Sequence, residues 1–174
     1  MILAISGSLR RSSLNSAALR AAARAAAPTG LVVELDDSVR SLPPFDPDRE
    51  VVPPESVLRF RRTVDAADGL LLAVPEYTFG LPGAFKNALD WLVRSGSLYH
   101  KPVALLHIAP PGRGARVRES LMHVLKAHNA AVTHYRVPIA PRDRDENGEI
   151  GDPRIVGALR AVVDEAARSA LSPR

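Results

Sequence analysis

The sequence predicts an α/β fold in which helices cover both faces of a doubly wound, five-stranded parallel sheet with the strand order 2-1-3-4-5. Short apolar runs alternate with amphipathic stretches along the chain. This alternation favours parallel strands joined by right-handed helical crossovers. Three of the runs are apolar almost throughout, as strands buried on both faces are. The other two contain more polar residues, which indicates that they form the two edges.

Five apolar runs predict the strands. The first, third and fourth runs lack charged residues, which places them at the centre of the sheet. The second run contains Glu34 and the fifth mixes polar with apolar residues, so both belong at edges. In chain order the expected strands are residues 2–6, 31–35, 69–74, 103–108 and 132–137.

The segments that follow the strands have helical patterns. The first is rich in alanine and is followed by Pro28 and Gly30, which stop a helix. Residues 36–54 are rich in proline and are predicted to form a loop. In chain order the expected helices are residues 13–27, 55–66, 82–94, 114–128 and 153–170.

Composition narrows the class of protein. The 174 residues correspond to about one domain, which we expect to span residues 1–174. The absence of cysteine excludes disulfides, thiolate catalysis and Cys-based metal sites. No apolar run approaches the ~20 residues that cross a bilayer, and no secretory signal is visible, so we expect a cytoplasmic protein without a membrane partner. The net charge of +4 comes from scattered basic residues, so no nucleic-acid partner is expected.

In the predicted strand order, ligands bind beyond the carboxyl ends of the first, third and fourth strands. The loop after the first strand contains serines, Arg10 and Asn15, and it opens a helix whose N-terminal N–H groups favour an anion. The P-loop and GxGxxG patterns are absent from it. Two interpretations remain: a phosphate site, or a serine-rich turn with an N-cap at Ser13.

The loops after the third and fourth strands are rich in proline and glycine. Prolines stiffen the first of these two loops, and glycines allow its backbone to approach a ligand closely. Such a loop with Tyr77 suits a flat heteroaromatic ring, although Tyr77 and Phe79 could instead cover the end of the sheet. Glu76 could act as an acid or base, or accept hydrogen bonds from nearby amides. Gly112 and Gly114 again permit contact between backbone and ligand.

The expected helix 82–94 has a wider apolar face than packing on one sheet requires. Ala84 and Trp91 extend this face, so we expect them to form part of a subunit interface. His107 lies within the fourth strand and is expected to be a buried core residue. The five histidines lack the spacing of metal ligands, so no metal site is expected.

Two motifs in these loops resemble a known family. GSLRxxSxN at 7–15 and PEYTxxxPGxxKNxxDW at 75–91 closely resemble the NADPH-dependent FMN reductases, a family that includes quinone, chromate and azo-dye reductases with a flavodoxin-like fold. The family pattern usually has Asn where this chain has Thr78. The resemblance implies FMN as cofactor, NAD(P)H as co-substrate, and assembly into a homodimer or homotetramer.

The resemblance also implies a set of cofactor-binding residues and no catalytic side chain, because the chemistry takes place on the flavin. Residues of the first motif would surround the phosphate, those of the second would line the ribityl chain and ring edge, and the glycines of loop 109–114 would flank the other ring edge. These residues are Ser8, Arg10, Ser13, Asn15 and Ser16; Pro75, Glu76, Tyr77, Thr78 and Phe79; and Gly112 and Gly114.

The expected function is that of an NAD(P)H-dependent FMN oxidoreductase. A hydride would pass from nicotinamide to FMN and, by a ping-pong route, on to small-molecule acceptors such as quinones, azo dyes, chromate or free flavin. One alternative is a flavodoxin-type one-electron carrier without reductase activity, which a stable semiquinone would reveal. A second is a flavin-free scaffold, which a colourless protein that takes up no FMN would favour.

Overall fold

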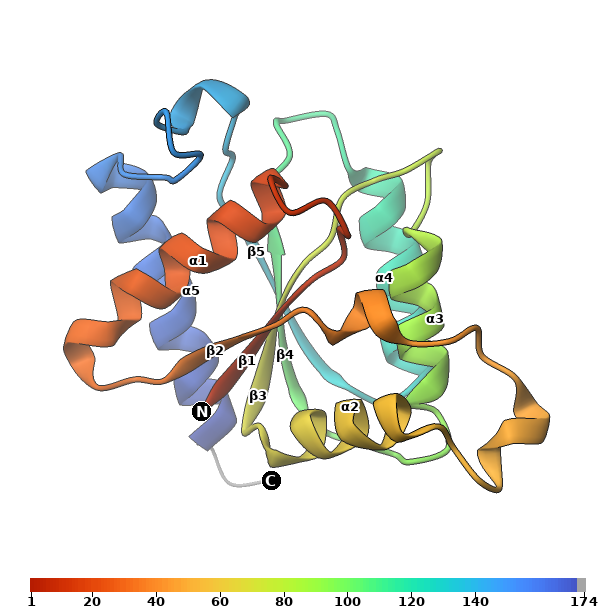
Figure 1. Ribbon diagram of the computed structural model, residues 1–174. Coiled ribbons are helices and arrows are strands. Elements are labelled where there is room, and N and C mark those ends of the chain that lie inside the picture. Colours follow the sequence, from red (N-terminus) through yellow and green to blue (C-terminus); the bar gives the residue numbers. More distant parts are fainter. Residues whose placement is uncertain (172–174) are drawn as a thin grey trace.

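A five-stranded parallel sheet lies at the centre of the computed structural model, which describes residues 1–171 (Figure 1). Its strand order is β2-β1-β3-β4-β5, and every pairing is parallel. The predicted fold class, strand order and edge strands are therefore confirmed. The strands are β1 (Ile2–Ser6), β2 (Val33–Asp36), β3 (Gly69–Ala73), β4 (Pro102–His107) and β5 (Ala131–Arg136).

Helices cover both faces of this sheet (Figure 1). One face carries α1 and α5, and the other carries α2, α3 and α4, each face enclosing its own hydrophobic core. The five expected helices are all present, with ends that differ from the prediction by a few residues at most. They are α1 (Leu14–Ala26), α2 (Glu55–Ala66), α3 (Gly83–Trp91), α4 (Ala115–Ala127) and α5 (Pro153–Leu171).

Alanines form most of the buried face of α1. Because alanine has a short side chain, α1 packs closely against both α5 and the sheet. This packing fixes the N-terminal end of α1, together with the loop before it, at the carboxyl edge of β1.

Trp91 is fully buried within its own subunit, so the expectation that it extends an interface is wrong. Its indole Nε1 donates to the carbonyl oxygen of Pro43 at 2.8 Å, and its ring contacts Phe45 edge-on with 5.1 Å between centroids. Asn87 holds the same segment, donating to the Pro43 carbonyl at 2.9 Å and accepting from the Phe45 amide at 2.6 Å. The proline-rich loop between β2 and α2 therefore covers the wide apolar face of α3.

Lys101, which lies just before β4, caps the carboxyl end of α2. Its ammonium group is buried and donates to the carbonyl oxygens of Val64 at 2.6 Å, Asp65 at 3.2 Å and Ala67 at 2.7 Å. A cation at a helix C-terminus also interacts favourably with the helix dipole. This one side chain thus joins the carbonyl groups at the end of α2 to the sheet.

Replacing Lys101 by Met should lower the free energy of unfolding by about 1.5–3 kcal/mol, because the charge-assisted bonds to the carbonyl groups at the end of α2 are lost. Urea denaturation measures the loss. Lys126→Met is the matched control, since Lys126 is exposed on α4, and it should change stability by less than about 0.5 kcal/mol. Equal effects of the two changes would contradict the capping role.

Candidate functional site

The loops after β1, β3, β4 and β5 meet at one edge of the sheet and enclose a cavity of about 690 Å³, which we call the main cavity. This size lies within the range of small-molecule sites, roughly 300–1,000 Å³. Its position at the carboxyl ends of parallel strands is where doubly wound folds bind ligands. The lining comprises residues 14, 15, 74–76, 79, 107–110, 112–117 and 139–141.

The loop between β1 and α1 leads into the N-terminus of α1, which can bind an anion. Ser13 is the N-cap, with extended backbone, and its side chain accepts from the Asn15 amide at 3.2 Å. The backbone N–H groups of Leu14 and Ser16, in the same first turn, have no acceptor within the helix. Unpaired N–H groups at the positive end of the helix dipole form a suitable phosphate site.

Asn15 supports this interpretation from inside the main cavity. Its side chain is 7% exposed, and its Oδ1 atom has no hydrogen-bond partner among residues 1–171. A buried polar atom without a partner is costly unless a ligand or water completes its bonding. The amide of Asn15 and the end of α1 therefore fit a ligand with polar groups beside its phosphate, as the ribityl phosphate of FMN has.

The loop after β3 forms a tight hairpin turn. The Tyr77 and Gly80 backbones exchange hydrogen bonds at 3.0 and 3.1 Å, and the two residues between them, Thr78 and Phe79, have φ values of 48° and 61°. Two left-handed residues in succession define a type I′ turn, which favours Asn at its first central position. The left-handed positions of this turn are Thr78 and Phe79, and neither Gly80 nor Gly83 has a positive φ.

Two side chains connect this hairpin to its neighbours. The Tyr77 hydroxyl lies 3.2 Å from Ser8 Oγ, which links the β3 and β1 loops. Glu76 Oε2 accepts from the Val117 amide at 3.0 Å and so caps the N-terminal turn of α4. Of the two roles considered for Glu76, the structure therefore has it accepting a hydrogen bond from a nearby amide.

The loop after β4 depends on two left-handed glycines. Gly112 has a φ of 82° and Gly114 a φ of 75°. A Cβ atom on Gly114 would lie 2.2 Å from Cε1 of His107, so only glycine fits there. His107 is buried, as expected, and its Nε2 donates to the Arg113 carbonyl at 3.0 Å. Burial lowers the pKa of His107, which favours the neutral form of its imidazole.

The residues that sequence reasoning assigned to the site are divided between two cavities. The main cavity contains Asn15, Pro75, Glu76, Phe79, Gly112 and Gly114 in its lining. A second, smaller cavity on the β2 side is lined by Ser8, Arg10 and Ser16, and neither lining includes Ser13, Tyr77 or Thr78.

Residues 139–141 and His107 line the main cavity although the sequence analysis did not assign them to it. The signal that could have identified residues 139–141 is topological, since they follow β5 at the edge where the other loops end. Within residues 1–171, no three His, Asp or Glu side chains lie close enough together to hold a metal ion. No helix in the same range is both long and apolar enough to span a membrane.

Comparison with known proteins gives consistent matches. A family model described as NADPH-dependent FMN reductase matches residues 1–143. An NAD(P)H-dependent FMN reductase of Pseudomonas aeruginosa is 43% identical over 108 residues, or 60% of this chain and 57% of that relative's length. A quinone reductase of Escherichia coli is 33% identical over 137 residues, which cover 75% of this chain and 72% of that protein.

Solved structures resemble the whole chain. The flavoenzyme NAD(P)H:acceptor oxidoreductase FerB of Paracoccus denitrificans aligns with a TM-score of 0.75 and 28% identity over 97% of each chain. An NADH:FMN oxidoreductase in its apo form aligns with a TM-score of 0.70 and 22% identity, covering 99% of this chain and 90% of that one. The second likeness concerns the fold alone.

Thr78→Asn should stabilise the protein by on the order of 1 kcal/mol, because asparagine tolerates the left-handed conformation better than a β-branched residue. The midpoint of urea denaturation measures the gain. Thr133→Asn in β5 is the control: Thr133 is exposed on an extended strand, where asparagine is disfavoured, so this change should stabilise nothing. Stabilisation by both substitutions would show that turn conformation is not the cause.

The stability of the protein should fall as the pH drops below about 6.5, the unperturbed value for histidine. Burial lowers the pKa values of His107, His128 and His134 in the folded state, so the unfolded chain binds more protons in that range. Urea titrations between about pH 8 and pH 5 should show the decline, and His107→Asn should make it shallower. A free energy of unfolding that stays constant over this range would contradict the role of the buried histidines.

Proposed function

This chain belongs to the NADPH-dependent FMN reductase family and is an oxidoreductase with FMN as its cofactor, and we propose that it uses NAD(P)H to reduce small-molecule electron acceptors at the main cavity. This proposal rests on one observation. The N-terminus of α1, whose first N–H groups have no acceptor within the helix, lies at the same cavity as the two stiff loops after β3 and β4. When bound, FMN accepts a hydride from nicotinamide and passes two electrons to a second substrate.

The end of α1 would hold the cofactor's phosphate. The N–H groups of Leu14 and Ser16 and the side chains of Ser8, Ser13, Asn15 and Ser16 supply donors, and Arg10 supplies the positive charge. Arg10 is exposed at the mouth of the loop, where its Nε donates to Ser12 Oγ at 2.9 Å. Charge-assisted bonds from a guanidinium to phosphate oxygens would add affinity and fix the orientation of the cofactor.

The loops after β3 and β4 would hold the flavin ring between them. Pro75, Tyr77, Thr78 and Phe79 form the side made by the β3 hairpin, and Gly112 and Gly114 form the side made by the β4 loop. Backbone N–H groups in these loops would stabilise negative charge that develops on the ring. We assign Glu76 to positioning rather than proton transfer, because its carboxylate already caps α4.

We further propose a ping-pong reaction, in which nicotinamide and acceptor occupy the same part of the main cavity in turn. The apolar lining around Phe79 and Pro141 suits flat, uncharged rings better than small ions. Quinones are therefore the first acceptors to test, and the name of the quinone reductase of Escherichia coli agrees with that choice. A homodimer or homotetramer remains our expectation for assembly, which sedimentation would measure.

Anaerobic stopped-flow mixing of the FMN-loaded protein with NADPH or NADH tests the proposed function. Loss of flavin absorbance within a turnover, followed by recovery on adding a quinone, is the expected result, with parallel double-reciprocal plots in the steady state. A flavin that nicotinamide does not reduce, or that stops at a stable semiquinone on titration, would overturn the proposal in favour of an electron carrier.

Arg10→Ala should weaken FMN binding roughly ten- to hundredfold, since charge-assisted bonds worth about 1.5–3 kcal/mol are lost. Arg11→Ala is the matched control next in sequence and should cost well under 1 kcal/mol of FMN affinity. Fluorescence titration of the apoproteins gives both dissociation constants. Turnover of the Arg10 variant should recover at high FMN concentration, because the hydride reaction takes place far from the phosphate. Equal FMN affinities for the two variants would show that the phosphate site is misplaced.

A further inference from the structure

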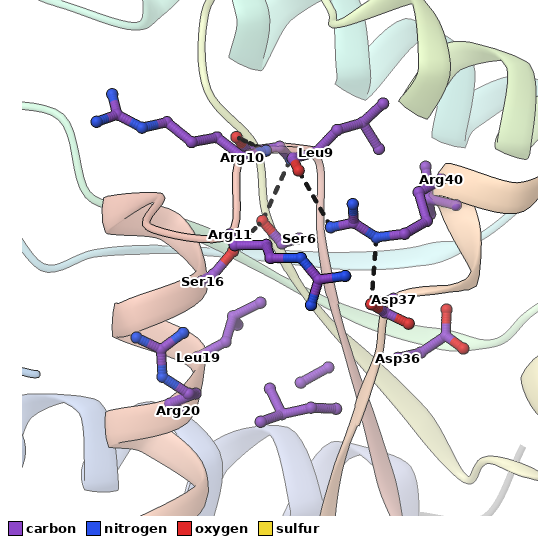
Figure 2. Close-up of a pocket in the computed structure, with 14 residues that line it drawn as sticks. Ser6, Leu9, Arg10, Arg11, Ser16, Leu19, Arg20, Asp36, Asp37 and Arg40 are labelled. Atoms are coloured by element: carbon purple, nitrogen blue, oxygen red, sulfur yellow. Dashed lines mark hydrogen bonds and ion pairs between the residues drawn. The ribbon is translucent and has the colours of Figure 1, made fainter. Parts of the chain in front are cut away.

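A second cavity, of about 320 Å³, lies at the carboxyl ends of β1 and β2 (Figure 2). We call it the β2-side cavity, because it lies toward β2 whereas the main cavity lies toward β5. Its floor is apolar: Ala4 and Leu19 are fully buried, Val39 is nearly so, and Leu35 is 46% exposed. Ser8, Arg10 and Ser16, which the proposed function assigns to the FMN phosphate, also line this cavity, but the proposed reduction uses none of its other residues.

Arginines surround the rim of the β2-side cavity. Four arginines and two aspartates contribute to its lining, which leaves an excess of positive charge. Arg40 is held in place by Asp37 Oδ2 at 3.2 Å and by the Leu9 carbonyl at 3.1 Å. Arg20 is paired instead with Glu149 at 2.7 Å, outside the cavity.

Arg11 has no hydrogen bond or ion pair with any residue between 1 and 171 that would hold its guanidinium elsewhere. Figure 2 shows its side chain extending across the cavity toward Arg40, while the side chain of Arg10 extends in the opposite direction. Arg11 is exposed and lies beside this cavity. Arg11 and Arg40 therefore present two guanidinium groups to the same space.

Asp36 gives the cavity an acceptor at the end of β2. Its Oδ2 accepts from the Ser38 hydroxyl at 2.7 Å and from the Ser38 amide at 3.2 Å. These bonds fix the carboxyl group in the cavity wall, while Oδ1 accepts no hydrogen bond from the described residues. Burial raises the pKa of Asp36, as expected for a carboxyl group partly shielded from water.

We propose that the β2-side cavity is a second ligand site, which binds a phosphorylated adenosine. The adenine ring would cover the apolar floor and the exposed face of Leu35, and Asp36 Oδ1 would accept from a ribose hydroxyl or the adenine amino group. Arg11 and Arg40 would bind the phosphate through charge-assisted hydrogen bonds. An inorganic anion would use the arginines but leave the apolar floor and the acceptor unused.

Two sources can supply this chemistry: the 2′-phosphoadenosine end of NADPH, or a free adenine nucleotide. The first source rests on the proposed function and would give preference for NADPH over NADH. The second source, a free adenine nucleotide, would bind to this site whether or not the enzyme is turning over. Both predict binding while FMN occupies the main cavity, because Arg11, Asp36 and Arg40 line the β2-side cavity and are absent from the lining of the main cavity.

Isothermal titration of the FMN-loaded protein with 2′,5′-ADP, 5′-ADP and inorganic phosphate tests the proposal. FMN absorbance is recorded during the titration. If FMN stays bound, the added ligand is not entering the phosphate site of the main cavity. A protein that holds no FMN would contradict the proposed function, and the Arg11→Ala and Arg40→Ala variants would still show whether nucleotide binds in the β2-side cavity. We expect at least one nucleotide to bind ten times more tightly than phosphate, with Arg11→Ala and Arg40→Ala each weakening it tenfold or more.

Arg49→Ala is the control, because Arg49 is exposed and lies outside the cavity lining, and it should bind nucleotide normally. A rise in the KM for NADPH relative to that for NADH in the Arg11 variant would assign the site to the co-substrate. An unchanged ratio together with equal binding of both ADP isomers would assign it to a free nucleotide. Nucleotide binding no tighter than phosphate binding, or equal losses in the Arg11 and Arg49 variants, would overturn the proposal.

Discussion

Backbone N–H groups at the ends of two helices are the constraint on which the candidate site depends. Helices α1 and α4 both begin at the carboxyl edge of the sheet, and each begins with N–H groups that the helix cannot satisfy. The chain itself supplies a carboxylate for α4, from Glu76 of a neighbouring loop. At α1 it supplies only the neutral Ser13 cap. The fold thus leaves one of the two positive helix ends for a ligand.

Close contact between loops keeps this arrangement rigid. A Cβ atom on Gly7 would lie 2.6 Å from Cγ1 of Val74, so glycine lets the loops after β1 and β3 touch. Gly114 allows the same closeness to His107, whose hydrogen bond to the Arg113 carbonyl fixes the β4 loop. The loops are therefore positioned by steric fit and hydrogen bonds before any ligand arrives, which reduces the entropy that binding would cost.

The sequence was sufficient for the sheet and its helices because polarity and periodicity are local properties. It was insufficient wherever the outcome depended on a distant segment. The wide apolar face that includes Trp91 is covered by the loop containing Pro43 and Phe45, which no helical wheel takes into account. The β3 hairpin could not be predicted from residue types. Its two left-handed positions are occupied by Thr78 and Phe79, whereas such positions usually carry glycine or asparagine. The role of Glu76 could not be predicted without the position of α4, because its partner Val117 lies 41 residues away in the chain.

The loop between β1 and α1 separates two cavities, and its adjacent arginines extend in opposite directions (Figure 2). Neighbouring residues in a turn cannot both direct a long side chain to the same point. In the proposed function this loop binds a phosphate through Arg10, which leaves Arg11 to serve the β2-side cavity. Asp36 at the end of β2 and Arg40 just after it belong to a different segment, and they line the same space. Charge from two separate segments therefore converges there, and the proposed phosphate site does not require it.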